Sequence, residues 1–443
     1  MSSLLSVGLD VGTTSTQLVV SRLTVENRAS SFAVPDMDIT ERAVLYKSPV
    51  YFTPLLDESH VDGAAIREIV QAEYQKAGIR REDVDTGAII ITGETSRKEN
   101  ARAVLDALSD YAGDFVVATA GPDLESVLAA KGAGAVELSR TAGKPVLHMD
   151  IGGGTSNLAL IEDGKILRTG CLNVGGRLIK FRDNGEITYV SSVLSGIFPG
   201  KPGEIATQSE LCELAESLTQ ALEMAAGLRE PTDLMQRLLT AETGEKWNPP
   251  EGEVIVSFSG GVADCIGSEL PWNQFGDLGP ILGQTIQKSH LCRGQYALGR
   301  ETIRATVIGA GSYSTQLSGS TVYSQNVRFP LKNLPVVKKN GGIHEGSVVL
   351  SLPGIPSPTY AQVRQIAREL AKTHPPELYV CLEADMAKAL GQALAVQLPP
   401  ETRILCIDRI RVGEDSFLDI GQPVGGAFPV VVKTLVLERS KHE

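Results

Sequence analysis

The chain has 443 residues, of which 42% are hydrophobic, and its formal net charge is −12. The negative charge argues against a broad nucleic-acid surface, because such a surface needs clustered Lys and Arg. No run reaches the roughly 20 apolar residues that a membrane span requires, and the first residues show no signal-peptide pattern. We therefore expect a cytoplasmic globular protein without a nucleic-acid or membrane partner, with about three domains at roughly 150 residues each.

Cysteine and histidine usage indicates neither disulfides nor a zinc site. The six cysteines are scattered without a CxxC pair, which predicts small buried apolar residues in a reducing compartment. They are Cys171, Cys212, Cys265, Cys292, Cys381 and Cys406. His148 lies in an apolar run beside Asp150, and we interpret it as a strand residue instead of a metal ligand.

The first part of the chain, residues 1–140, alternates strand and helix signals. Strands are predicted at VGLDV, TQLVVSRL and AVLYKSPVYF, and a helix is predicted around residues 66–74, where apolar side chains share one face. A β-branched run at residues 88–92 predicts another strand, and Pro122 is placed for a first helical turn. This order predicts one mixed α/β domain.

The second part, residues 141–325, opens at PVLHMDIGGG. A long amphipathic helix is predicted after Ser209, because apolar residues from Leu211 to Leu222 fall on one stripe. The Pro- and Gly-containing region 183–208 predicts a loop or an inserted subdomain. The string EVIVSFSGGVADCI then predicts a strand that ends in a glycine turn.

The remainder, residues 326–443, predicts a further α/β unit. Strand, helix, strand (YVCLE), helix (384–396) and strand (ILCID) follow one another, and PVVVKTLVL predicts a last strand. The pattern does not decide between a third domain and a C-terminal extension of the first.

A repeated motif links the first two parts. LDVGTTSTQLVV and MDIGGGTSNLALI align residue for residue, with Asp10 matching Asp150 and Gly12 matching Gly152, about 140 residues apart. Hydrophobic residues resume with period two after the glycines, which predicts a β-hairpin with the glycines at its tip. Two such tips that face each other would close on a polyphosphate from both sides.

The chemistry of the repeat suits a nucleotide and a metal. Glycine lets the backbone approach phosphate closely, and amide and hydroxyl groups at the tips can donate to its oxygens. The predicted phosphate-binding residues are Gly12, Thr13, Thr14, Gly152, Gly153, Gly154 and Thr155. Asp10 and Asp150 are predicted to hold hydrated Mg²⁺, which takes few carboxylates and keeps several waters. Gly260 and Gly261 predict a backbone platform for adenosine.

Together these strings resemble the actin-like ATPase superfamily, which includes actin, sugar kinases and the large heat-shock chaperones. A closer resemblance, to the ethanolamine ammonia-lyase reactivating factors, is carried by SPVYFTPLLD, IITGETSRKENA, ATAGPDLESVL, HMDIGGGTSNLA, SFSGGVAD and VVVKTLVLE. The resemblance implies an α/β actin-like fold of duplicated mixed-sheet domains around a nucleotide cleft, with a C-terminal α/β extension.

The resemblance also implies a function. With ATP and Mg²⁺, such a factor releases damaged cobalamin from ethanolamine ammonia-lyase, an adenosylcobalamin enzyme, so that intact cofactor can bind. Association with a bacterial microcompartment and a homo-oligomeric state are left open. The partner surface is expected in region 183–208 or in the C-terminal unit, and the two hairpin-bearing units are expected to move relative to each other.

Catalytic candidates are Asp10, Asp150, Glu94 and Glu125.

Two other functions remain open at this point. In a small-molecule kinase of the same superfamily a cleft carboxylate would deprotonate the acceptor hydroxyl, and Glu94, Asp123, Glu125 and Asp264 are candidates that could equally be helix-end carboxylates. A nucleotide-binding filament or scaffold protein is the other alternative.

Overall fold

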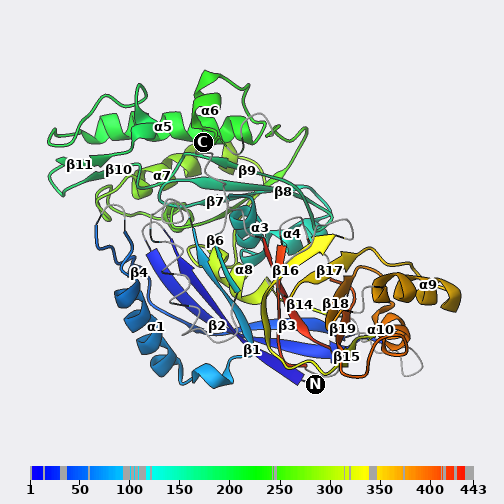
Figure 1. The fold of residues 1–443 in the computed structure, drawn as a ribbon. Helices are drawn as coiled ribbons and strands as arrows, with labels where there is room; N and C mark the ends of the chain where they lie inside the picture. Colours follow the sequence, from blue (N-terminus) through cyan, green and yellow to red (C-terminus); the bar gives the residue numbers. More distant parts are fainter. Residues whose placement is uncertain are drawn as a thin grey trace, which may run out of the picture.

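The computed structural model divides into three parts, each built around a β-sheet (Figure 1). It describes residues 2–12, 15–29, 37–57, 60–92, 100, 104, 108, 116–119, 122–241, 243, 247–313, 315–318, 321–338, 347–372, 375–410, 412, 416–423 and 427–434. In this part of the chain, no helix combines the length and apolarity needed to cross a membrane.

The first sheet has the strand order β3-β2-β1-β5-β6. Its strands are β1 (Ser2–Val11), β2 (Ser15–Asn27), β3 (Met37–Lys47), β5 (Thr86–Ile91) and β6 (Val116–Thr119), and the short β4 (Tyr51–Phe52) pairs with β2. Strands β1, β2 and β3 are antiparallel, whereas β1, β5 and β6 run parallel. Helix α1 (Gly63–Ala77) is capped by the Asp62 side chain and ends at Gly78, which has a positive φ of 68°.

The second sheet repeats this topology, with the order β9-β8-β7-β12-β13. Its strands are β7 (Val146–Ile151), β8 (Ser156–Glu162), β9 (Lys165–Leu172), β12 (Ile255–Ser259) and β13 (Tyr296–Leu298). As in the first sheet, three strands form an antiparallel meander and two more extend it in parallel. The sequence repeat is therefore also a structural repeat, in which β7 and β12 correspond to β1 and β5.

Two helices cross between the sheets. Helix α3 (Pro122–Gly132) follows β6 but packs on the second sheet together with α4 (Ala135–Ala142), and α8 (Ala305–Tyr313) follows β13 but packs on the first sheet. Helices α3 and α8 also pack against each other. A Cβ on Gly132 would lie 1.8 Å from the Ala305 carbonyl oxygen, and one on Gly309 would lie 2.0 Å from that of Leu128. This close approach requires glycine at both positions.

The segment between β9 and β12 forms a cap on the second sheet. It contains the hairpin of β10 (Ile179–Phe181) and β11 (Ile187–Val190), followed by α5 (Gln208–Ala225) and α6 (Asp233–Leu238). The predicted amphipathic helix is confirmed as α5, which starts at a reciprocal Thr207–Glu210 capping box. Region 183–208, predicted as a loop or an inserted subdomain, contains secondary structure, namely β11 and a short 3₁₀ helix (Ser192–Leu194). Helix α7 (Gly279–Lys288) connects β12 to β13.

The third part is an eight-stranded sheet in the order β14-β21-β20-β16-β17-β18-β19-β15. The strands are β14 (Thr315–Leu317), β15 (Tyr323–Gln325), β16 (Leu331–Lys338), β17 (Val349–Leu352), β18 (Glu377–Leu382), β19 (Arg403–Ile407), β20 (Ser416–Ile420) and β21 (Pro429–Thr434). Helices α9 (Tyr360–Ala371) and α10 (Ala387–Ala395) connect its parallel strands, as expected for α/β units.

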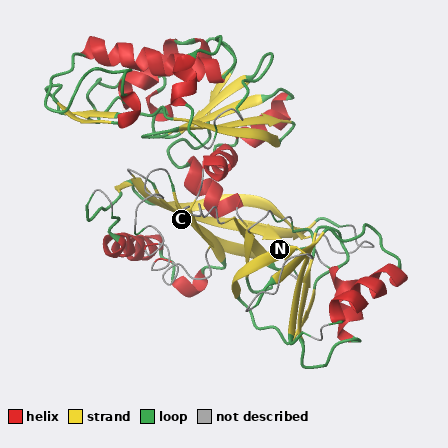
Figure 2. Ribbon diagram, turned by 45° about the horizontal axis from the view of Figure 1, so that its top comes forward, coloured by secondary structure: helices red, strands yellow, loops and turns green. Residues whose placement is uncertain are grey.

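The third part docks on the first. Val431 of β21 shares a core cluster with Ala88 and Ile90 of β5, and the Thr86 and Thr315 hydroxyls lie 2.8 Å apart. In Figure 2 the second sheet and its helices stand apart from the remaining strands, which lie together in the lower half of the view. The structure thus confirms the predicted α/β class, with duplicated mixed sheets and a C-terminal α/β unit.

The cysteine interpretation is confirmed in part. All six cysteines are free, and four are buried, whereas Cys212 and Cys292 are half-buried and pack against the core of the second part.

Candidate functional site

A cavity of about 280 Å³ lies where the two glycine hairpins meet. The predicted site residues that line it are Asp10, Gly12, Glu125, Asp150, Gly152, Gly153, Gly154, Thr155, Gly260, Gly261 and Asp264. They come from both sheets, from α3 and from the turn after β12. Residues about 250 positions apart in the sequence are therefore brought into one pocket of a size suited to a small-molecule ligand.

Four other candidates are placed differently. Thr13, Thr14 and Glu94 lie outside the described residues. Asp123 is exposed and does not line the cavity; its carboxylate accepts a hydrogen bond of 2.5 Å from the Thr169 hydroxyl. Among the described candidates for a cleft base, Glu125 and Asp264 are thus the ones that reach the cavity.

The two hairpins close with the same backbone hydrogen bond. The amide of Gly12 donates to the carbonyl of Ser15 over 2.9 Å, and the amide of Gly152 donates to the carbonyl of Thr155 over 2.9 Å. A Cβ placed on Gly154 would meet nothing within 4 Å. The second tip therefore has open space above its backbone, which suits close approach of a ligand.

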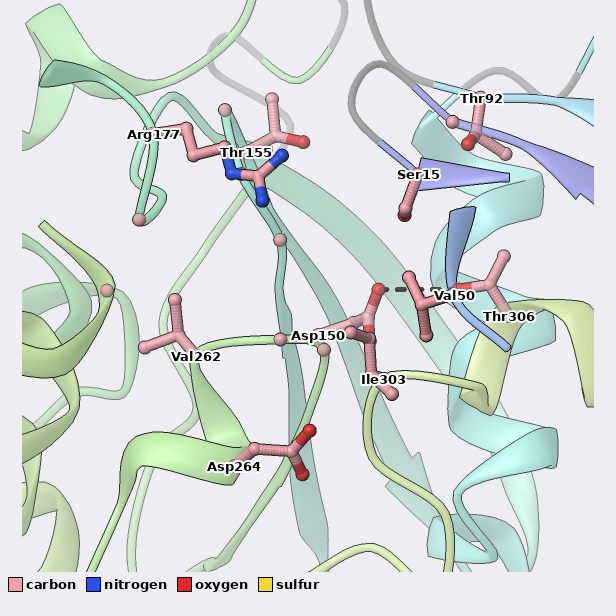
Figure 3. Close-up of a pocket in the computed structure, with 18 of the residues that line it drawn as sticks. Ser15, Val50, Thr92, Asp150, Thr155, Arg177, Val262, Asp264, Ile303 and Thr306 are labelled. Atoms are coloured by element: carbon pink, nitrogen blue, oxygen red, sulfur yellow. Dashed lines mark hydrogen bonds between the residues drawn. The ribbon is translucent and has the colours of Figure 1, made fainter. Parts of the chain in front are cut away.

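Asp10 and Asp150 are buried carboxyls held by hydroxyl donors. The Thr92 hydroxyl donates to Asp10 over 2.9 Å, whereas Asp150 accepts from Ser259 and, over 3.4 Å, from Thr306 (Figure 3). Burial raises the pKa of Asp10 to about 7. The hydrogen bond from Thr92 lowers this pKa, and the negative charge of Asp150 raises it further. Burial likewise raises the pKa of Asp150 to about 6. The two carboxyls therefore interact electrostatically within one cavity.

His148 supports this arrangement from inside β7. It is fully buried in β7, with Nδ1 3.2 Å from the Ser257 hydroxyl and Nε2 2.9 Å from the Ser259 hydroxyl. Burial lowers its pKa to about 3, so the ring is neutral. Ser259 in turn donates to Asp150, and His148 is confirmed as a strand residue.

The donor set fits a hydrated Mg²⁺ with a polyphosphate. Within the described residues, no group of three or more His, Cys, Asp or Glu side chains could enclose a metal ion. Asp10 and Asp150 both line the cavity and would hold such an ion, since Mg²⁺ takes few carboxylates and keeps several waters. A bound cation would also stabilise the charged forms of Asp10 and Asp150, whose burial otherwise disfavours them.

Arg177 is a cavity residue that the sequence did not reveal. The loop after β9 lies against the second hairpin, where the amides of Gly176 and Arg177 donate to the carbonyls of Gly152 and Gly153 over 3.0 and 2.6 Å. Nε of Arg177 donates to Asp277 over 3.0 Å, and the guanidinium extends into the cavity near Thr155 (Figure 3). The available signal in the sequence was the string VGGR after a strand. Its two glycines allow the backbone to approach another segment closely, and the arginine that follows them is then held beside that contact.

Gly260 brings the third motif close to the second hairpin. Its φ is +85°, and a Cβ there would lie 2.3 Å from the carbonyl oxygen of Ile151. Gly261 follows it along the cavity wall, where a Cβ would be 3.7 Å from Ile303. The role of Gly260 and Gly261 as a platform for adenosine remains a prediction; both residues line the cavity.

The comparisons place the chain in a family. The sequence matches the family described as ethanolamine utilisation protein EutA over residues 2–347 and 342–438. It is 37% identical over 468 residues to an ethanolamine ammonia-lyase reactivase EutA of Salmonella typhimurium, with 98% of each chain covered. It is 37% identical over 465 residues to the protein of the same name from Escherichia coli, again with 98% of each covered.

Similarity to solved structures is more distant. A Ppx/GppA family member from Aquifex aeolicus is 15% identical, with 70% of this chain and 97% of that chain covered and a TM-score of 0.43. The family match and the full-length relatives carry the assignment instead: the chain belongs to the EutA family of ethanolamine utilisation proteins.

Proposed function

We propose that this chain is an ATP-dependent reactivase of ethanolamine ammonia-lyase, which releases damaged cobalamin so that intact adenosylcobalamin can bind. The observation that carries the proposal is the 37% identity, over 98% of both chains, to two proteins named as reactivases of this lyase. A match of this extent includes all three sheets and both glycine hairpins, so it is not limited to the nucleotide-binding parts.

In this proposal the cavity binds ATP with Mg²⁺. Asp10 and Asp150 hold the hydrated ion, and the metal neutralises phosphate charge when it is bound. The amides and hydroxyl of residues 152–155, together with the Arg177 guanidinium, donate to the phosphates, and Gly260 and Gly261 accommodate adenosine. The burial of both carboxyls and the open space at the second tip support these roles.

Hydrolysis needs a group that orients the attacking water. Glu125 is the candidate for this role, since it lines the cavity from the first turn of α3. A helix that lines the cavity through Glu125 and packs on the second sheet would also couple the nucleotide to the relative position of the sheets. ATP and ADP states can favour different arrangements only if their contacts differ, and the terminal phosphate provides that difference.

The division into units 1–140, 141–325 and 326–443 remains part of the proposal, as does a partner surface outside the cavity. Region 183–208 offers exposed Tyr189 and Ile205, and the C-terminal unit offers exposed Tyr360 and Val396. We further propose that the protein is cytoplasmic and associates with a microcompartment, where it would meet the lyase.

Recovery of inactivated lyase tests the proposal. Ethanolamine ammonia-lyase that has lost its adenosyl group is incubated with this chain, ATP, Mg²⁺ and fresh adenosylcobalamin, and deaminating activity is followed. Recovery that needs all four additions supports the reactivase. ATP turnover only with a small hydroxyl acceptor, and no recovery, would indicate the kinase; light scattering that rises with ATP and protein concentration, without turnover, would indicate a filament.

A further inference from the structure

Each hairpin carries a carboxamide opposite its aspartate. Gln17 pairs with Asp10 across β1 and β2, and Asn157 pairs with Asp150 across β7 and β8. Directly opposed residues of antiparallel strands project from the same face of the sheet. Both carboxamides line the cavity, so the structural repeat places two Asp–carboxamide pairs around it.

The carbonyl oxygens of these carboxamides have unmet hydrogen-bonding capacity. Gln17 and Asn157 are each only 2% exposed, and neither Oε1 of Gln17 nor Oδ1 of Asn157 has a hydrogen-bond partner among the described residues. The Gln17 amide is oriented, because its Nε2 donates to the Ile303 carbonyl over 3.1 Å. A buried acceptor without a donor is destabilising, so two at matched positions of one cavity indicate a ligand that donates.

The required donor is not a phosphate. Phosphate oxygens are acceptors, and so are the two aspartates in the charged forms that a bound cation favours, and a carbonyl oxygen repels them. Water bound to a divalent cation is a strong donor, because the cation polarises its O–H bonds. Mg²⁺ keeps several such waters, and neutral carbonyl groups can hold them without adding charge to the two carboxylates.

We infer that Gln17 and Asn157 are positioning residues that accept hydrogen bonds from the water shell of the divalent cation held by Asp10 and Asp150. This inference rests on the proposed nucleotide site. The carboxamides act through the waters and not by direct coordination, and they fix the orientation of the hydrated ion from both sheets.

The test measures binding of a non-hydrolysable ATP analogue to the full chain by calorimetry, over a series of Mg²⁺ concentrations and in EDTA. Gln17→Met and Asn157→Leu remove the acceptor and keep most of the side-chain volume. Gln17→Glu and Asn157→Asp keep an acceptor oxygen. The matched control is Gln287→Met, because Oε1 of Gln287 also lacks a partner among the described residues although the residue lies outside the cavity.

The inference predicts that Gln17→Met and Asn157→Leu each raise the Mg²⁺ concentration for half-maximal binding by about 10-fold or more, the usual effect of losing an outer-shell partner. Binding in EDTA should be unchanged by the Met and Leu substitutions, and Gln287→Met should retain the wild-type Mg²⁺ response. The Glu and Asp variants keep an acceptor oxygen and add negative charge beside the cation, so they should need no more Mg²⁺ than wild type. Thermal unfolding should show no loss of stability in Asn157→Leu, because its Oδ1 accepts no hydrogen bond among the described residues. Gln17→Met should be less stable than wild type, because it also removes the hydrogen bond from Nε2 to the Ile303 carbonyl, so its Mg²⁺ response is compared at a temperature where it is fully folded.

Two outcomes would overturn the inference. Folded Gln17→Met and Asn157→Leu proteins with the wild-type Mg²⁺ response would show that the carboxamides have no role toward the ion. Wild-type protein that binds no nucleotide at any Mg²⁺ concentration would refute the proposed site itself, and the inference with it.

Discussion

The guanidinium carbon of Arg177 lies 5.6 Å from the centre of the Phe52 ring. Arg177 belongs to the loop that packs on the second hairpin, whereas Phe52 belongs to β4 of the first sheet. The contact therefore joins the two hairpin-bearing units at the cavity, and Arg177 is also bonded to Asp277. One cationic side chain thus contacts residues of both units and also lines the cavity proposed to hold phosphates.

Replacing Arg177 should weaken nucleotide binding. Arg177→Ala removes a charged donor from the cavity, and a charge-assisted hydrogen bond contributes about 1.5–3 kcal/mol. The dissociation constant of an ATP analogue should therefore rise by about 10- to 100-fold. Arg182→Ala is the control, because this exposed arginine pairs with Glu186 away from the cavity. Equal affinities for the two variants, measured by calorimetry, would remove Arg177 from the phosphate site.

Phe52→Ala should have a smaller effect, since an exposed cation–π contact contributes about 0.5–1 kcal/mol. Phe52 is 80% exposed, so its replacement should preserve stability. We expect a twofold to fivefold faster release of a fluorescent ATP analogue in stopped-flow measurements. Leu56→Ala, at another exposed apolar residue of the same segment, is the comparison. Faster release in both variants would indicate a general effect of the surface.

The raised pKa values of Asp10 and Asp150 predict two opposite pH dependences. The folded protein retains protons that the unfolded chain releases from carboxyls with an ordinary pKa of 3.8, so these groups lower stability as the pH rises from about 4 to about 7. Mg²⁺ binding needs the charged forms, so metal affinity should rise through pH 6 to 7.

Thermal unfolding and calorimetry between pH 4 and pH 8 check both parts. The doubly substituted Asp10→Asn/Asp150→Asn protein should be more stable than wild type near pH 8, and this advantage should disappear near pH 4. A constant stability difference across the range would show that neither carboxyl has a raised pKa.

The crossing of α3 and α8 should tolerate no added side chain. Gly309→Ala introduces a Cβ only 2.0 Å from the Leu128 carbonyl oxygen, and overpacking typically costs about 1–3 kcal/mol, more than alanine gains in helix propensity. Urea unfolding should show this loss. Gly294→Ala is the matched control, because a Cβ there meets nothing within 4 Å. If the two variants unfold at the same urea concentration, the helices do not pack as closely as described.

The sequence predicted the parts of the site that local pattern determines. Period-two hydrophobicity after Asp10 and Asp150 indicated two hairpins, and the glycines indicated tips open to a ligand. The crossing of α3 was not predictable, since an apolar helix face shows that it is buried but not against which sheet. Gln17 and Arg177 were missed for a related reason, because their roles depend on the cavity that forms only when both sheets meet.

Hydrolysis should depend on both carboxylates. Asp10→Asn and Asp150→Asn should each lower ATP turnover by roughly two orders of magnitude, the effect of losing one main electrostatic contributor. Neither substitution changes side-chain size appreciably, so circular dichroism should match wild type. Normal turnover in both folded variants would refute the two-carboxylate metal site.

Release of cobalamin from the lyase tests the central claim most directly. Inactivated ethanolamine ammonia-lyase that carries damaged cobalamin is mixed with this chain and Mg²⁺, together with ATP, ADP or no nucleotide, and the free cobalamin that passes a size-exclusion filter is measured by absorbance. We predict release with ATP and wild-type chain, and little release with ADP, without nucleotide or with Asp150→Asn. Equal release in all four conditions, or none with ATP and wild-type chain, would contradict an ATP-dependent reactivase.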